Sequence, residues 1–183
     1  MTKYRRLYVP NALYFFTVVT NNRDNIFDDP NARRLLRESI NFVKESWPFD
    51  IEGFVLLPNH LHTIWRLPEN DDNFSTRWRL IKYKFSLRYG KHRKRESSIS
   101  QSKIKKGERM FWQRRFWEHV IRNEKDFANH LDYIHYNPVK HKYVKKPCDW
   151  KWSSFHKYVQ SGWYDQNWGD SDTDEIIDKC VGE

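Results

Sequence analysis

The stretch DIEGFVLLPNHLHTIWRL, residues 50–67, decides the fold. It contains two apolar runs, 50–57 and 61–67, that are rich in Ile, Val, Leu, Phe and Trp. Most of these residue types are enriched in β-strands. Pro58 and Asn59, which separate the runs, are typical of tight turns. Two strand-like runs joined by a short turn predict an antiparallel pair of strands.

Strand and helix signals alternate on both sides of this pair. The run LYFFTVVT (13–20) ends at two asparagines and predicts a strand followed by a turn. Helical spacing of apolar residues after Asp29-Pro30 predicts a helix that stops before Pro48. The remaining signals predict a helix over 74–89 ended by Gly90, a strand at FWEHVI (116–121), and a helix from Asn123 to Pro138.

This order of elements predicts an α+β fold. Strand, helix, strand, strand, helix, strand, helix is typical of a ferredoxin-like split β-α-β arrangement, an antiparallel sheet with helices packed on one face. A chain of 183 residues is short enough for one domain with one core. We expect that domain at 1–165, with a flexible basic loop at about 91–109 and an acidic C-terminal tail at 166–183.

The positive charge of the chain is concentrated in one segment. The formal net charge is +9, yet residues 77–115 hold fifteen Lys and Arg against two Glu, a local charge of +13. Such a segment attracts polyanions, and no amphipathic apolar stripe or lipidation motif directs it to a membrane. We therefore expect nucleic acid as the partner, with a solubilising surface as the alternative.

Features of secreted and membrane proteins are absent from the sequence. Cys148 and Cys180 stand in unrelated contexts and form no C-x-x-C pair. No signal-type apolar stretch follows Met1, and the longest apolar run, 13–19, is too short to span a bilayer. We expect a cytoplasmic protein that associates with the nucleoid.

His60 and His62 form the first candidate site. Residues i and i+2 of a strand point to the same face, so the two imidazoles can face one ion. Imidazole binds many divalent metals, and a pair leaves positions open for a third ligand, water and a substrate oxygen. The alternative is a polar strand face without metal.

The segment LDYIHYNPVK, residues 131–140, is the second candidate. On a helix Tyr133 and Asn137 are i and i+4, hence neighbours on one face. An amide oxygen suits a hard cation, and a phenol beside a cation is a candidate nucleophile. Alternatively, Tyr133 packs as a helix aromatic and Asn137-Pro138 only ends the helix.

Three sequence blocks resemble a known family. LPNHLHTIWRLPE, then FWEHVIRNEKDFANHLDYIHYNPVKHKYV, then DWKWSSFHKY are similar to the bacterial REP-associated tyrosine transposases. These are relatives of the single-tyrosine insertion-sequence transposases in the HUH nuclease superfamily. The resemblance extends from YRRLYVPNALYFFTVVTNNR near the N-terminus to about Trp163.

The resemblance implies a mechanism. His60 and His62, completed by Asn137, would bind a divalent cation, Mg²⁺ or Mn²⁺, and Tyr133 would attack a phosphate of single-stranded DNA. The product would be a 5′-phosphotyrosine and a free 3′-hydroxyl. The implied substrates are REP-type hairpins with an adjacent tetranucleotide, and the implied oligomeric state is a monomer.

Residue type and position suggest further DNA contacts. Cationic side chains could reach phosphates from three places: the N-terminal arm, the exposed side of the 74–89 helix, and the residues beside the FWEHVI strand. Two aromatic residues could stack on unpaired bases, although at least one of the two could pack in the core instead. They are Arg5, Arg6, Arg77, Arg79, Lys82, Lys84, Arg114, Arg115, Trp152 and Phe155. His119, within that strand, is a further candidate near the site.

The sequence leaves two other functions open. A non-catalytic protein could grip DNA hairpins through the same fold and charge. A hydrolytic HNH-type nuclease could activate water through His60 or His62, which would release 5′-phosphate ends with no protein attached.

Overall fold

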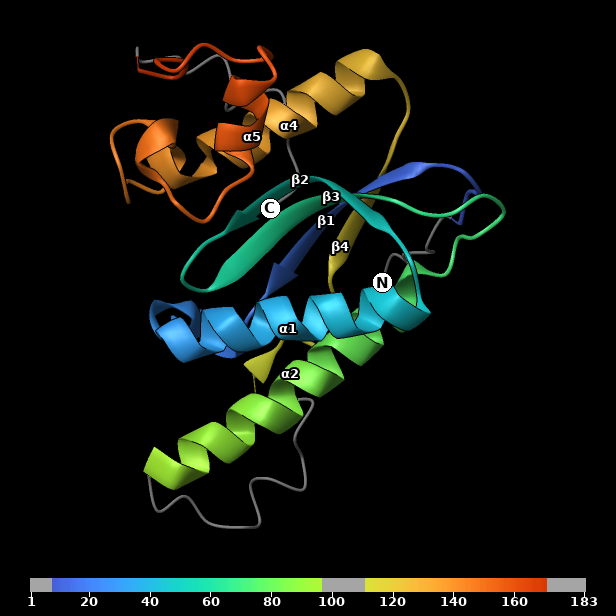
Figure 1. Cartoon of the computed structure of the whole chain (residues 1–183), viewed down its shortest axis with the longest axis vertical. Helices are drawn as coiled ribbons and strands as arrows, with labels where there is room; N and C mark the ends of the chain where they lie inside the picture. Colours follow the sequence, from blue (N-terminus) through green and yellow to red (C-terminus); the bar gives the residue numbers. More distant parts are fainter. Residues whose placement is uncertain (1–7, 97–110, 171–183) are drawn as a thin grey trace, which may run out of the picture.

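An antiparallel sheet forms the centre of the computed structural model, which describes residues 8–96 and 111–170 (Figure 1). Within these residues its strands are ordered β2-β3-β1-β4, so β1 pairs with both β3 and β4. The strands are β1 (Leu13–Val19), β2 (Asp50–Leu56), β3 (His60–Arg66) and β4 (Trp117–Ile121). The predicted antiparallel pair at 50–67 is therefore confirmed, as is the α+β class.

Helices cover both faces of this sheet (Figure 1). Two of them, α1 and α2, lie on one face, whereas α4 and α5 lie on the other. The helices are α1 (Pro30–Ser46), α2 (Phe74–Glu96), α4 (Glu124–Lys140) and α5 (Phe155–Gln160), with short 3-10 turns η1 (Asn21–Arg23), η2 (Ile26–Asp28) and η4 (Pro147–Asp149).

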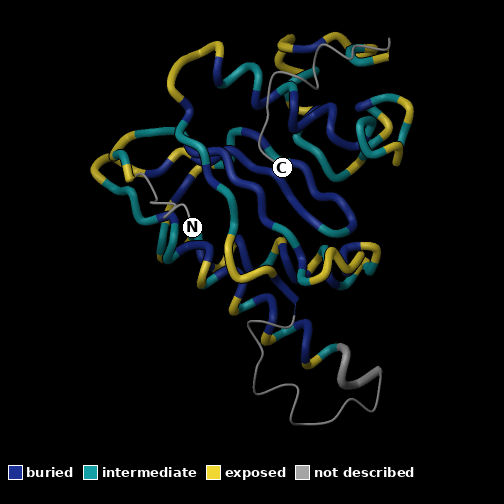
Figure 2. The backbone as a smooth tube through the Cα atoms, turned by 180° about the vertical axis from the view of Figure 1, so that it is seen from behind, coloured by how far each residue is buried: buried dark blue, intermediate teal, exposed yellow. Residues whose placement is uncertain are grey.

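The prediction that helices pack on one face holds only for α1 and α2. The reason lies in the alternation along β1: Tyr14 and Phe16 contact the α1 and α2 side, whereas Phe15 belongs to the cluster under α4. Because both faces of the central strand are apolar, both need cover. The two inner strands, β1 and β3, are accordingly buried along most of their length (Figure 2).

Two predicted helix ends are wrong. α4 continues past Pro138 to Lys140, and backbone bonds from His141 to Asn137 and from Tyr143 to Pro138 close its last turn. α2 continues past Gly90 to Glu96, because a single glycine costs a helix only about 1 kcal/mol. Residues 91–96 of the expected loop are therefore helical, and residues 97–110 lie outside the described part.

Trp168 lies three residues past the predicted domain boundary at residue 165 and still contacts the core. Trp168 packs against Tyr164 and Phe155 under α4, with ring centroids 4.5 and 6.0 Å away. The acidic tail from 171 onward lies outside the described residues. No helix in the described part of the chain has both the length and the apolar content to cross a membrane.

Candidate metal and nucleophile site

β3 presents both candidate histidines to α4. His60 and His62 are buried, and their ring centroids lie 4.9 Å apart. Leu61 and Trp65 point to the opposite face and join the core under α1 and α2. This period of two is the one that the sequence predicted for a strand.

Neighbouring side chains hold the two imidazoles in place. His60 Nδ1 lies 2.6 Å from Asn59 Oδ1, and His62 Nδ1 lies 2.9 Å from Thr17 Oγ1. Because Asn59 Oδ1 accepts, His60 Nδ1 carries the proton and Nε2 carries the lone pair. An outer hydrogen bond that fixes the tautomer in this way is typical of metal-binding histidines.

α4 brings the tyrosine to these rings. The Tyr133 ring centroid lies 5.2 Å from that of His62, and Tyr133 is buried. The close approach of helix and sheet depends on Gly53: a Cβ there would lie 3.1 Å from Leu131 Cδ1 and 3.2 Å from Ile134 Cδ1. Residues about seventy positions apart thus meet across the helix–sheet interface.

Asn137 lies one turn after Tyr133 on the buried face of α4. It is fully buried, and neither Oδ1 nor Nδ2 has a hydrogen-bond partner among the described residues. A buried amide without partners is costly, and a cation is one means of satisfying its oxygen. One turn later, the His141 ring centroid lies 5.2 Å from that of His60.

The residues present fit a divalent metal. Two imidazoles held by second partners and a buried amide oxygen form a mixed nitrogen and oxygen set. Sequence reasoning missed His141, because the predicted helix stopped at Pro138, three residues earlier. Its spacing from Asn137, four residues, was the signal that could have found it.

Lys140 contacts the candidate nucleophile. Its Nζ lies 3.5 Å from Tyr133 Oη and 4.9 Å from the centre of the Tyr133 ring. A cation beside a hydroxyl favours its ionised form. The sequence did not indicate this contact, because Lys140 is seven residues away and lies beyond the proline.

A second polar cluster lies at the start of α4. The Asp126 carboxylate lies 3.0 Å from His119 Nε2, 2.9 Å from Arg122 Nε and 3.1 Å from His130 Nδ1. Burial raises the pKa of the Asp126 carboxyl, but hydrogen bonds from Arg122 and His119 outweigh burial and hold that pKa well below its usual range. Burial also lowers the pKa of His130.

This cluster is separate from the predicted metal set. The ligand atoms of His119, Asp126 and His130 lie within 4.8 Å of one another and could face an ion. Because Arg122 already pairs with the carboxylate, we interpret the group as an ionic clamp between β4 and α4. The Phe15 ring lies between it and the site, 4.8 Å from His130 and 6.0 Å from Tyr133.

Several predicted DNA contacts lie at the surface. Arg79 on α2 is exposed, as are Arg114 and Arg115 just before β4. Lys84 lies 3.0 Å from the centre of the Phe42 ring. Trp152 is half-buried beside α1, and Arg5 and Arg6 fall outside the described residues.

Three predicted contacts are wrong. Arg77 is fully buried, because Asp71 and the backbone carbonyls of Trp47, Pro48 and Asn73 hold its guanidinium. Lys82 is buried and donates to the Gln113 carbonyl at 3.1 Å. Phe155 is fully buried in the core under α4. Of the two aromatic residues predicted to stack on bases, Trp152 and Phe155, it is therefore Phe155 that packs in the core.

Comparisons with known proteins identify the family of this chain. The family model described as "Transposase IS200 like" matches residues 8–137. The chain is 42% identical to a REP-associated tyrosine transposase of Escherichia coli K12, over 95% of this chain and 94% of that protein. A solved structure of a REP-associated tyrosine transposase bound to a REP hairpin is also 42% identical and covers 95% of this chain and 94% of that one, with a TM-score of 0.78.

Proposed function

Because this chain belongs to the IS200-like transposases, a family of enzymes, we propose that it cleaves and rejoins single-stranded DNA hairpins through a covalent Tyr133 intermediate. The observation that carries the proposal is the 5.2 Å separation of the Tyr133 and His62 rings, with the buried Asn137 amide one turn away. A protein that only binds DNA needs no such arrangement.

His60, His62 and Asn137 would hold the metal. When bound, Mg²⁺ or Mn²⁺ supplies positive charge to the non-bridging phosphate oxygens. Tyr133 loses its phenolic proton to solvent, and its Oη forms a bond to phosphorus. The bond from phosphorus to the 3′ oxygen breaks, and that oxygen takes up a proton as a free 3′-hydroxyl. Lys140 favours the phenolate before attack.

The substrate follows from the relatives. A transposase that is 42% identical to this chain was solved with a REP hairpin, which supports a DNA hairpin as the substrate here. We propose that this hairpin carries an adjacent unpaired tetranucleotide. Tyr133 and His62 come from the same chain, so a monomer suffices to complete the site. We place the reaction in the bacterial cytoplasm, at the nucleoid.

An adduct assay tests this function. Labelled hairpin DNA with a single-stranded extension is incubated with the protein and Mg²⁺, and the products are separated on a denaturing gel. We expect a protein–DNA adduct with wild type and with Tyr136→Phe, a matched control three residues along α4. We expect none with Tyr133→Phe or with EDTA.

Two outcomes would replace the proposal. Tight hairpin binding without an adduct under any divalent metal would favour the non-catalytic binder. Cleavage that persists in Tyr133→Phe and leaves 5′-phosphate ends free of protein would favour the hydrolytic nuclease.

A further inference from the structure

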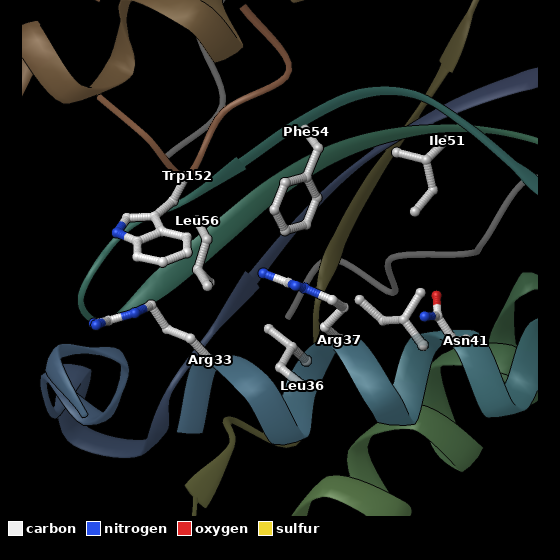
Figure 3. Close-up of a pocket in the computed structure, with 9 residues that line it drawn as sticks. Arg33, Leu36, Arg37, Asn41, Ile51, Phe54, Leu56 and Trp152 are labelled. Atoms are coloured by element: carbon white, nitrogen blue, oxygen red, sulfur yellow. The ribbon is translucent and has the colours of Figure 1, made fainter. Parts of the chain in front are cut away.

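We propose that the groove between α1 and β2 binds an unpaired nucleotide of the DNA strand that flanks the hairpin (Figure 3). This inference rests on the proposed function and adds a binding site outside the metal and nucleophile site. The groove has a volume of about 180 Å³, and α1, β2 and the segment around Trp152 form its walls.

The walls suit a nucleobase. Four aliphatic residues line the groove, Leu36 and Ile40 from α1 and Ile51 and Leu56 from β2, and they make an apolar slot between helix and strand. Phe54 and Trp152 add two aromatic rings. A base stacked on an aromatic side chain contributes about 1–3 kcal/mol, and only an unpaired base exposes its face for stacking.

The rim suits a phosphate. Arg33 and Arg37 are charged residues of the lining, and no acidic residue lines the groove. Arg33 is held in position: it donates to the carbonyls of Phe27 and Asp28, and its guanidinium carbon lies 4.6 Å from the centre of the Trp152 ring. A cation fixed beside an aromatic ring can contact the phosphate of a nucleotide that stacks on the ring.

Arg37 is the arginine of α1 that lacks an internal partner. It is exposed and makes no hydrogen bond or ion pair with any residue in the described ranges. By contrast, Arg34 pairs with Glu38 at 2.6 Å. Arg37 can therefore bind an external anion without breaking an existing contact, whereas Arg34 cannot.

A short turn of the chain connects the groove to the nucleophile site. Leu56, in its wall, is followed by the turn that leads to His60, and Leu57 N–H donates to the His60 carbonyl at 2.8 Å. The 150–154 segment crosses the edge of β2 here: Leu56 N–H donates to Trp152 O, and the Trp150 indole donates to Leu56 O.

Aromatic rings connect the two places. From His60 the next ring is His141 at 5.2 Å, followed by Tyr143 at 6.0 Å and Trp150 at 5.6 Å. Trp150 lies on the α4 side of β2 and Trp152 on the α1 side. A single strand that leaves the site can follow these rings around the sheet edge and reach the groove.

A binding experiment tests the groove without cleavage. All variants carry Tyr133→Phe, and the buffer contains EDTA. Affinity is measured for a fluorescent hairpin with an unpaired extension and for the same hairpin with a blunt end. We expect Arg37→Ala to weaken binding of the extended hairpin about tenfold or more and to leave the blunt hairpin unchanged. Arg34→Ala, the matched control on the same helix, should change neither by more than about twofold.

A second measurement locates the stacking. 2-Aminopurine placed at successive positions of the extension should be quenched at one position by the protein, and Trp152→Leu should restore its fluorescence. Equal effects of Arg37→Ala and Arg34→Ala, or equal losses for both hairpins, would overturn the groove. Adduct formation by Tyr133 is measured separately. If the protein prefers the extended hairpin to the blunt one but forms no adduct, only the proposed reaction is overturned.

Discussion

Single side chains decide whether the two histidines can act as ligands. Thr17 and Asn59 each contact one imidazole at Nδ1. The Asn59 oxygen only accepts and so sets the His60 tautomer, whereas the Thr17 hydroxyl fixes the orientation of the His62 ring. Thr17 comes from β1, the strand next to β3, and it pairs directly with His62 in the sheet. The pairing of β1 with β3 therefore places the Thr17 hydroxyl beside the His62 ring, and no loop is needed to position it.

Thr17→Val removes this hydroxyl and nearly keeps the side-chain volume. We expect the affinity for Mn²⁺ to fall 10- to 100-fold, because the His62 ring loses the bond that fixes its orientation. Isothermal calorimetry measures the affinity without any DNA. Thr63→Val is the control, since Thr63 lies next to His62 on β3 but its hydroxyl donates to the Gly53 carbonyl of β2. Equal affinity in wild type and Thr17→Val would contradict this role.

Lys140→Met removes the cation beside the nucleophile. We expect the pH at which adduct formation is half-maximal to rise, because the phenolate loses a neighbouring positive charge. Lys142→Met, an exposed lysine two residues later, should leave this pH unchanged. A pH profile of single-turnover adduct formation distinguishes the two, and superimposable profiles for wild type and Lys140→Met would refute the assignment.

At the scale of elements, the position of α4 determines the site. Its first turn is tied to β4 through Asp126, and its middle touches β2 where Gly53 leaves room. Tyr133, Asn137 and His141 follow along the same face. A small displacement of the helix therefore moves all three relative to the histidines of β3.

Gly53→Val tests this dependence. Its Cβ alone would lie 3.1 Å from Leu131 and 3.2 Å from Ile134, closer than ordinary contact, so we expect α4 to shift and the adduct rate to fall at least about tenfold. Gly90→Ala is the control, because its Cβ would lie 3.7 Å from Phe111, an ordinary contact. An unchanged rate in a folded Gly53→Val protein would show that the site tolerates movement of α4.

The sequence predicts those parts of the site that depend on local periodicity. Period two placed His60 and His62 on one face, and the spacing of four paired Tyr133 with Asn137. Arg77 was misplaced because its partners, Asp71 and three backbone carbonyls, depend on tertiary structure. A signal existed nevertheless: Arg77 stands four residues before Ile81, and Lys82 stands four residues after Trp78, both on the buried side.

At the scale of the whole molecule, the C-terminal segment anchors α4 from outside. His135 Nε2 lies 2.7 Å from Ser154 Oγ, and the Tyr164 hydroxyl donates to Asp132 at 2.7 Å. Burial, with a smaller effect of His156, lowers the pKa of His135 to about 3. The folded protein therefore keeps this ring neutral at pH values where an unfolded chain would protonate it.

The free energy of unfolding should depend on this difference. Because the His135 pKa is lowered from 6.5, its stabilisation is complete above that value and is lost as the pH falls toward 3. Between pH 7 and pH 5 we expect wild type to lose about 2 kcal/mol more than His135→Gln. Urea unfolding at several pH values measures how the free energy of unfolding changes with pH in the two proteins. The same pH dependence in both would count against a buried neutral His135.

The charge of the chain as a whole should govern its affinity for DNA. The segment 77–115 carries +13, so log K should fall steeply with log salt, with a slope of about −0.9 per duplex phosphate contacted. Replacing Arg114 and Arg115 by Ala should reduce the slope by roughly two. Arg66→Ala, which removes a cation paired with Glu52, should leave the slope unchanged. A flat plot for wild type would exclude electrostatic binding.

The most direct measurement identifies the residue that becomes linked to DNA. Wild-type protein is reacted with hairpin DNA and Mg²⁺, digested with trypsin and nuclease, and analysed by tandem mass spectrometry. The account predicts a single nucleotide-modified peptide with the 5′-phosphate on Tyr133. Modification at another residue, such as Tyr136, or fully cleaved DNA with no modified peptide, would contradict it.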